Sequence, residues 1–344
     1  MNITDEIIVD SSLELKQKET VDFKKLLYIL AAAVIIVTAV RWLSFELLDK
    51  LFTALADGSP EVAEPAEPVF MSELEYNILF FISWFINHFV IFAPALLIFG
   101  LVFRKRMEFQ KTGEPYEFKK SWIIPIFILS YTLSVISGMI SSFIAYIMRP
   151  VFGGEGLRDV FEGAMPQTSG QVIIMLILVG FIGPVCEELI YRHWLLVPLR
   201  RFGDMQAVVI TALLFGFFHG NLTQLLYTTI AGLIYGIVAI RANSVVPAMI
   251  LHIINNCYIV LYAHLSDVAE ATENHTLEGI LIMSFYAVLV AGLFFLIYFL
   301  VKKRLSVENS NPHLPSAERA RIVAENPMIL LMMIVIITYT IIGS

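Results

Sequence analysis

Long apolar blocks separated by short charged segments run along most of the 344-residue chain. A membrane-spanning α-helix needs about 20 mostly apolar residues to cross about 30 Å of hydrocarbon. The pattern therefore predicts an all-α polytopic membrane protein with about eight or nine transmembrane helices. The fifth block is short and could be part of a helix that enters from a re-entrant turn. The blocks are 26–48, 76–103, 122–148, 171–200, 205–220, 223–240, 244–263, 279–301 and 327–343.

The charges that flank the blocks predict an orientation. Lys24 and Lys25 precede the first block, and Lys and Arg follow the second, fourth, sixth and eighth blocks. The intervening loops are acidic, among them the Pro- and Glu-rich stretch 58–68, which we expect to be a disordered or extended external loop. The positive-inside rule then places the amino terminus and the basic loops in the cytosol. We expect an integral multi-pass protein, of the cell membrane if the source is bacterial.

Composition agrees with this class and excludes others. Hydrophobic residues make up 58% of the chain and charged residues 15%, whereas soluble domains have roughly a quarter charged residues. Cys186 and Cys257 both lie inside apolar blocks, so a disulfide framework is not expected. The first 23 residues are polar and acidic, which argues against a cleavable signal peptide. The chain has no Gly-rich phosphate loop and no basic patch for nucleic acid, so the expected partners are the lipid bilayer and a peptide or membrane-protein substrate.

Ionisable and polar residues gather at three places inside the apolar blocks. Such residues cost roughly 2.5–3.5 kcal/mol each on insertion, so each one raises a functional question. Counted from the charged residue at the predicted cytosolic boundary, Glu187, His219 and His252 lie 13, 15 and 11 residues into their blocks. At about 1.5 Å per residue, all three lie roughly 16–23 Å from that side. A common depth on three helices predicts one shared site.

Helical spacing predicts which of these side chains face the site. Glu188 and Arg192 are four residues apart and can neutralise each other as a structural pair. Glu187 is rotated by about 100° and remains free to face a cavity. His252 and Asn256 are also four residues apart and point toward the same partner.

Smaller features support the assembly of such a site. Phe215 lies one turn before His219 and is expected to pack beside it as structural support. The pairs Gly216/Gly220 and Gly232/Gly236 have the small-xxx-small spacing that lets helices approach closely. Outside the three clusters, Asn87 and His88 in the second block match no motif and are interpreted as helix-packing polar residues.

The residue types in these clusters suit amide hydrolysis. A carboxylate beside a neutral imidazole can remove a proton from water, which then attacks a peptide carbonyl. A second imidazole and an amide can donate hydrogen bonds to the developing oxyanion. We therefore predict that the catalytic set is Glu187, Glu188, His219, His252 and Asn256.

A metal is the open alternative for this chemistry. Glu187, His219 and His252 also have the composition of a zinc site with two His and one Glu ligand. The chain nevertheless contains no His-Glu-x-x-His motif, the common signature of zinc peptidases. The residues leave two cofactor states open, none or a divalent metal such as zinc.

Taken together and in this order on successive predicted helices, three motifs resemble the CPBP (Abi) family of CAAX proteases and bacteriocin-processing enzymes, which are related to Rce1-type prenyl-protein endopeptidases. The resemblance covers roughly residues 170–260. It implies that Glu187 and His219 activate water and that His252 and Asn256 form the oxyanion hole. The family has been described both as metalloproteases and as metal-independent glutamate proteases, so the metal question stays open. The motifs are Glu187-Glu188-x-x-x-Arg192, Phe215-x-x-x-His219 and His252-x-x-x-Asn256.

The expected function is that of an intramembrane endopeptidase. It would hydrolyse a peptide bond of a membrane-associated, prenylated or peptide substrate by water activated through Glu and His. The alternatives are a non-enzymatic scaffold or bacteriocin self-immunity protein that retains the motifs, and a proton-coupled transporter built on the buried Glu and His. The expected parts of the chain are a cytosolic polar segment 1–25, transmembrane helices and acidic external loops 26–169, a catalytic core 170–265, and transmembrane helices with a cytosolic linker 266–344.

Overall fold

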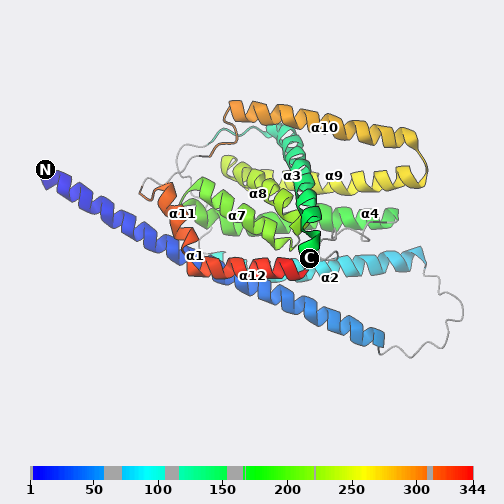
Figure 1. Cartoon of the computed structure of the whole chain (residues 1–344), viewed down its shortest axis with the longest axis horizontal. Helices are drawn as coiled ribbons and strands as arrows, with labels where there is room; N and C mark the ends of the chain where they lie inside the picture. The colour runs from blue at the N-terminus through cyan, green and yellow to red at the C-terminus, as the bar shows by residue number, and fades with distance from the viewer. Residues whose placement is uncertain are drawn as a thin grey trace.

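The computed structural model describes residues 3–57, 72–104, 116–152, 166, 168–220, 222–307 and 313–343. Every regular element in these residues is a helix, which confirms the all-α class (Figure 1). The expected external loop 58–68 lies outside the described residues. The elements are α1 (Ile3–Asp57), α2 (Glu73–Phe103), η2 (Lys120–Trp122), α3 (Ile123–Phe152), α4 (Ser169–Met175), η3 (Leu176–Ile182), α5 (Gly183–Glu188), η4 (Leu189–Leu196), α6 (Val197–Arg200), α7 (Asp204–Phe218), α8 (Leu222–Arg241), α9 (Val246–Ala271), α10 (His275–Val301), α11 (Ser316–Ala324) and α12 (Pro327–Gly343).

Seven of the described helices are long and apolar enough to cross a membrane. The count becomes eight if α11 and α12, which meet at a bend of 61°, form one broken span. The short fifth block is the 15-residue helix α7, which at about 1.5 Å per residue is shorter than the hydrocarbon layer. The described helices therefore give seven spans, or at most eight, which is the lower of the two expected counts.

The first helix is much longer than its apolar block. Helix α1 contains 55 residues and already begins at Ile3, so the polar start of the chain continues directly into the first span. No Gly or Pro interrupts the sequence until Gly58 and Pro60, which follow the end of the helix at Asp57. Because these two residues are the strongest helix breakers, their absence explains the uninterrupted helix.

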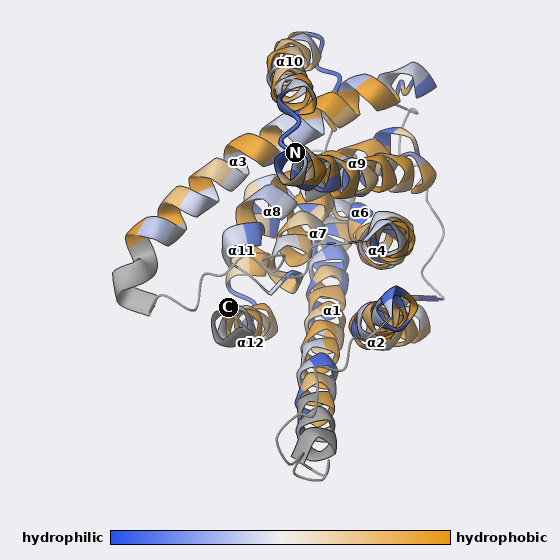
Figure 2. Ribbon diagram, turned by 90° about the vertical axis from the view of Figure 1, so that its right-hand side faces the viewer, coloured by the Kyte–Doolittle hydropathy of each residue, from blue (hydrophilic) through white to orange (hydrophobic). Residues whose placement is uncertain are grey.

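Helices α7 and α8 lie at the centre of the molecule, with α3 crossing α8 at a steep angle (Figures 1 and 2). Helix α9 packs against α8 and against η3, while α10 lies at the periphery beside α3. Helix α12 lies along α1, on the opposite side of the molecule from α10. The long helices are predominantly hydrophobic along their length, as expected for helices in lipid (Figure 2).

Glycines permit the close contact between α7 and α8. A Cβ atom on Gly232 would lie 3.1 Å from the Ala212 Cα atom, and one on Gly216 would lie 2.8 Å from the Leu225 carbonyl oxygen. The predicted packing role of these glycines is thus confirmed. Gly220 differs, because it lies beyond the end of α7 with φ +67°. Gly220 therefore does not pack α7 against α8: it supplies the left-handed conformation that ends the helix.

Candidate active site

The fourth span carries both glutamates and contains two widened turns. The π-helical segments η3 and η4 end at Ile182 and Leu196, and a proline follows each of them two residues later, at Pro184 and Pro198. Proline cannot donate the helical hydrogen bond, and its ring clashes with the carbonyl group four residues earlier. The π turns widen the helix where that clash would fall, and such turns are frequent at functional sites. Helix α5, which carries the glutamates, lies between these two turns.

Glu188 and Arg192 form a completely buried ion pair. Glu188 Oε1 lies 3.1 Å from Arg192 Nη1, and both side chains are 0% exposed. Arg192 Nη2 also donates to the Gly232 carbonyl oxygen at 3.0 Å, which ties the fourth span to α8. The predicted pairing is present, and the pair additionally joins two helices.

Aromatic rings surround the Arg192 guanidinium. Its central carbon lies 4.7 Å from the ring centroid of Phe215, 5.6 Å from that of Tyr235 and 5.8 Å from that of Tyr191. Cation–π attraction strengthens where water is excluded, so these rings compensate part of the desolvation of the cation. Arg192 is thereby held in one position behind Glu188.

His252 bridges the two glutamates. Its Nδ1 atom lies 3.0 Å from Glu188 Oε1, and its Nε2 atom lies 3.4 Å from Glu187 Oε2. Because Arg192 stabilises Glu188 as a carboxylate, His252 Nδ1 must carry a hydrogen to bond with it. His252 Nε2 and Glu187 then face each other with one exchangeable proton to share. The Glu187 side chain is 19% exposed, so this carboxylate is the accessible member of the pair.

His219 lies just beyond the end of α7, next to the same groups. Its Nδ1 atom lies 2.7 Å from the Phe215 carbonyl oxygen, which can only accept, so Nδ1 carries the hydrogen. A neutral ring therefore has its lone pair on Nε2. Electrostatic interactions link His219 to both Glu187 and His252. The structure thus brings the predicted His219 and the two glutamates into one neighbourhood.

Phe215 is the apolar centre of this neighbourhood. Its ring meets His219 edge-on at a centroid distance of 4.8 Å and His252 at 5.7 Å. The ring also meets that of Tyr191 at 5.1 Å. The expected contact between Phe215 and His219 is present, and the same ring limits the movement of His252.

Asn256 makes contacts different from those we expected. Its Nδ2 atom donates to the Val179 carbonyl oxygen in η3 at 3.0 Å, and its Oδ1 atom accepts from Asn255 Nδ2 at 3.3 Å. An amide group has two N–H hydrogens, so one remains for another acceptor. In this conformation Asn256 ties α9 to the π-helical segment of the fourth span.

His88 in α2 also approaches the glutamates, although its sequence context indicated only a packing role. Its Nδ1 atom lies 2.9 Å from the Trp84 carbonyl oxygen, and its Nε2 atom lies 3.8 Å from the position that a Cβ on Gly183 would occupy. Gly183 is one turn before Glu187, with which His88 interacts electrostatically. In the sequence, the one sign that His88 could approach the site was the presence of an ionisable residue within an apolar block.

The conditional metal set does not form a ligand cluster in this conformation. Both ring nitrogens of His252 face carboxylates, at 3.0 Å and 3.4 Å. Within the described ranges, no group of three or more His, Cys, Asp or Glu side chains is arranged to hold a metal ion. Glu187, His219 and His252 as metal ligands therefore stay a prediction.

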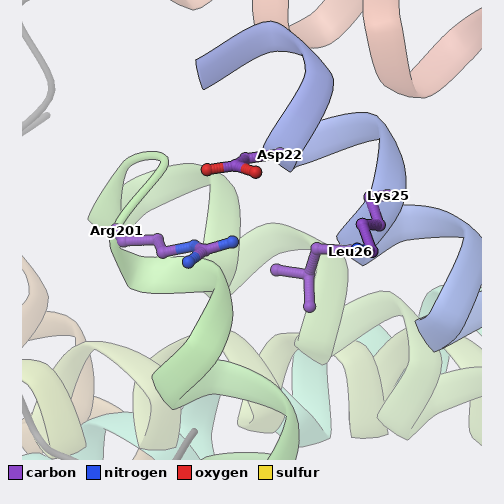
Figure 3. A pocket seen from close by; sticks show the side chains of 4 residues that line it. All are labelled: Asp22, Lys25, Leu26 and Arg201. Atoms are coloured by element: carbon purple, nitrogen blue, oxygen red, sulfur yellow. The ribbon is translucent and has the colours of Figure 1, made fainter. Parts of the chain in front are cut away.

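A separate hollow lies on the surface near the start of the first span. Its volume is about 210 Å³, and it is lined by Asp22, Lys25, Leu26 and Arg201 (Figure 3). None of the predicted site residues lines it. The candidate active site and this hollow are therefore distinct features.

Comparison with known proteins points to one family. Residues 169–258 match the family described as type II CAAX prenyl endopeptidase Rce1-like. A putative membrane peptidase, YdiL, of Bacillus subtilis is 25% identical over 141 residues, which cover 41% of this chain and 54% of that protein. The membrane-embedded CAAX protease MroQ of Staphylococcus aureus is 22% identical over 195 residues, which cover 54% of this chain and 76% of that protein. The chain thus matches about half the length of the Bacillus protein, and no solved structure matches it significantly.

All five predicted catalytic residues and both supporting residues lie within the matched segment. This segment runs from the start of α4 into α9 and thus includes the ion pair, the bridging histidine and the end of α7. Residues 169–258 of this membrane protein are therefore similar to the Rce1-like type II CAAX prenyl endopeptidase family.

Proposed function

We propose that this protein is an intramembrane endopeptidase that hydrolyses a peptide bond with water activated by Glu187. The observation that carries the proposal is the bridging imidazole. His252 links the buried, neutralised Glu188 to the partly exposed Glu187, so one proton can move between Glu187 and an imidazole.

The proposed reaction uses Glu187 as the general base. Its carboxylate takes a proton from water, and the oxygen of that water forms a bond to the peptide carbonyl carbon. The C–N bond then breaks, and the proton on Glu187 passes to the leaving nitrogen. The products are a carboxylic acid and an amine, so the atoms and protons balance.

The neighbouring groups stabilise charge in this reaction. His219 lies beside Glu187 and directs its Nε2 lone pair toward the same water, while His252 Nε2–H and the second N–H of Asn256 donate to the oxyanion. Glu188, which is paired with Arg192, accepts the His252 Nδ1–H and orients the ring from behind. Removing one oxyanion donor costs on the order of 10²–10³ in rate in characterised hydrolases.

The relatives agree with a peptidase, since one is called a putative membrane peptidase and the other a membrane-embedded CAAX protease. We propose the same class of substrate for this chain, a membrane-associated or prenylated peptide segment. The four-part division of the chain and the cytosolic amino terminus remain parts of this proposal. A substrate that enters from the side of the predicted basic loops would reach Glu187 partway through the bilayer.

The test compares newly formed protein termini by mass spectrometry in membranes that contain wild-type protein or Glu187→Gln at matched abundance. We expect termini that appear only with the wild type, because Gln cannot accept the proton of water. Asp204→Asn is the control: Asp204 is another acid of segment 169–258, and its printed hydrogen bond goes to Arg200 and to none of the predicted site residues. This control should give the wild-type termini.

Equal termini with wild type and Glu187→Gln would reject the proposal. That outcome would favour the non-enzymatic scaffold or immunity alternative, in which the motifs serve packing.

A further inference from the structure

The end of α7 determines where His219 lies. Each of the last four carbonyl groups of this helix accepts a hydrogen bond. In lipid, each of the last four carbonyl groups of a helix needs a donor from elsewhere, because no water replaces the missing bonds. Two of the donors are the backbone and ring of His219, and a third comes from the helix-ending Gly220. The bonds are His219 Nδ1 to Phe215 O at 2.7 Å, His219 N to Gly216 O at 3.2 Å, Gly220 N to Phe217 O at 3.0 Å and Arg41 Nη1 to Phe218 O at 3.2 Å.

The fourth donor comes from a distant part of the chain. Arg41 lies in the first span, 177 residues before Phe218 and outside the Rce1-like segment 169–258. Its side chain is buried, although arginine within a span is costly and needs compensation. The partial negative charge at a helix carboxyl end favours a cation, which accounts for the position of Arg41 at the end of α7.

The last span completes the contact. The Arg41 guanidinium lies 5.4 Å from the ring centroid of Phe218 and 5.7 Å from that of Tyr339 in α12. A Cβ on Gly220 would lie 3.1 Å from the Tyr339 ring, so this ring also rests against the turn that follows His219. Helices α1 and α12 lie side by side, and α12 contacts α7 (Figure 1).

The positive charge of Arg41 acts on residues of the candidate active site as well as on the end of α7. Arg41 interacts electrostatically with His219 and with Tyr191, which lies one turn after Glu187. Its Nε atom is buried and has no hydrogen-bond partner in the part of the chain that the structure describes. A residue needed only to anchor α1 would not have to lie beside His219.

We propose that Arg41 is a positioning residue for His219, and that the first and last spans, outside the Rce1-like segment, thereby form part of the active site. The proposal rests on the proposed function, in which His219 orients the attacking water. Without Arg41, the Phe218 carbonyl would lose its donor, and the last turn of α7 would rearrange to recover one. Misplacement of a reacting group by about 1 Å can cost on the order of 100-fold in rate.

Another arginine provides a matched control. Arg319 in α11 is 1% exposed and donates from Nη1 to the Phe202 carbonyl oxygen, so it has the same burial and the same type of bond as Arg41. It contacts none of the predicted site residues in the described structure. Replacing it therefore tests the cost of losing a buried arginine–carbonyl bond away from the site.

The experiment compares Arg41→Lys, Arg41→Met and Arg319→Lys in the full chain in detergent or proteoliposomes. A peptide that spans the cleavage site identified with the wild type is the substrate, and kcat, KM and the thermal midpoint are measured. We expect Arg41→Met to lower kcat by about 10-fold to 100-fold with little change in KM. Arg41→Lys, which keeps the charge and a donor, should recover part of the loss. Arg319→Lys should lower the thermal midpoint and leave kcat within about twofold.

A second readout does not depend on activity. The ring-nitrogen NMR signals of His219, assigned by their absence in His219→Gln, should shift in both Arg41 variants and not in Arg319→Lys. If Arg41→Met does not fold, Arg41→Lys alone decides through the same two measurements.

The outcomes separate this inference from the proposed function. An unchanged kcat and an unchanged His219 signal in the folded Arg41 variants would overturn the inference, even with an active wild type. If the wild type cleaves nothing, the proposed function fails. A shifted His219 signal would then still support the link between Arg41 and the end of α7.

Discussion

Two buried arginine–carboxylate pairs lie in the Rce1-like segment 169–258, and only one of them belongs to the candidate active site. Glu188 and Arg192 are 3.1 Å apart within the fourth span. Arg200 and Asp204 are 2.9 Å apart where that span ends and α7 begins. Both pairs have i,i+4 spacing and side chains that are at most 6% exposed. Spacing, charge and burial therefore do not distinguish a functional pair from a structural one.

The two pairs differ in the third residue that hydrogen-bonds to them. Arg200 also donates to the Asn243 side-chain oxygen, a neutral acceptor that cannot exchange a proton at ordinary pH. Glu188 instead bonds to His252, whose other nitrogen faces the partly exposed Glu187. The proposed function depends on this difference, because a titratable imidazole lies between the buried carboxylate and the accessible one only in the Glu188 pair.

We expect the largest loss of stability from removing the Arg192 guanidinium. Arg192→Met would leave the Glu188 carboxylate buried without its counter-ion, and breaking such a pair typically costs about 3–5 kcal/mol. Denaturant unfolding in detergent measures the loss. Arg200→Met should cost less, because its pair lies at the end of the span. Equal losses in the two variants would mean that the two pairs have the same energetic environment.

The second effect concerns the bridging group. His252→Gln can still donate to Glu188 but has no second nitrogen that could donate to the oxyanion. We expect kcat/KM for the cleaved substrate to fall on the order of 10²–10³-fold, while the thermal midpoint changes little. Activity within tenfold of the wild type would show that the bridge is structural, as the Arg200–Asp204 pair is.

The third prediction concerns the contact between α7 and α8, which lies beside the Glu188–Arg192 pair. In Gly216→Ala, the new Cβ would lie 2.8 Å from the Leu225 carbonyl oxygen, and this backbone atom cannot move aside. We expect a loss of about 1–3 kcal/mol from overpacking of α7 against α8. The matched variant is Gly279→Ala in α10, where a Cβ meets nothing within 4 Å. That variant should be neutral or slightly more stable, because alanine favours the helix. An unfolding free energy equal to that of the wild type in Gly216→Ala would indicate that α7 and α8 can move apart at no cost in stability.

Much of the site followed from helical periodicity. Glu188 and Arg192 meet because residues four apart share a helix face, and Phe215 meets His219 for the same reason. Their common depth could be counted from the charged span ends, because the rise per residue of a helix is constant. The π-helical segments η3 and η4 were not foreseen. Prolines mark their positions, but a proline can also kink or end a helix, so the sequence does not choose among these outcomes.

The membrane class, the helices and the polar residues that approach one another can all be predicted from the amino-acid sequence, because these depend on local hydrophobicity and on regular helical geometry. Three contacts become visible only in the folded molecule: His252 bridges both glutamates, Asn256 bonds to Val179 and Arg41 reaches the end of α7. Each of these contacts joins different helices. Their partners depend on how each helix is rotated and tilted against its neighbours, which side-chain packing sets and which hydrophobicity leaves undetermined.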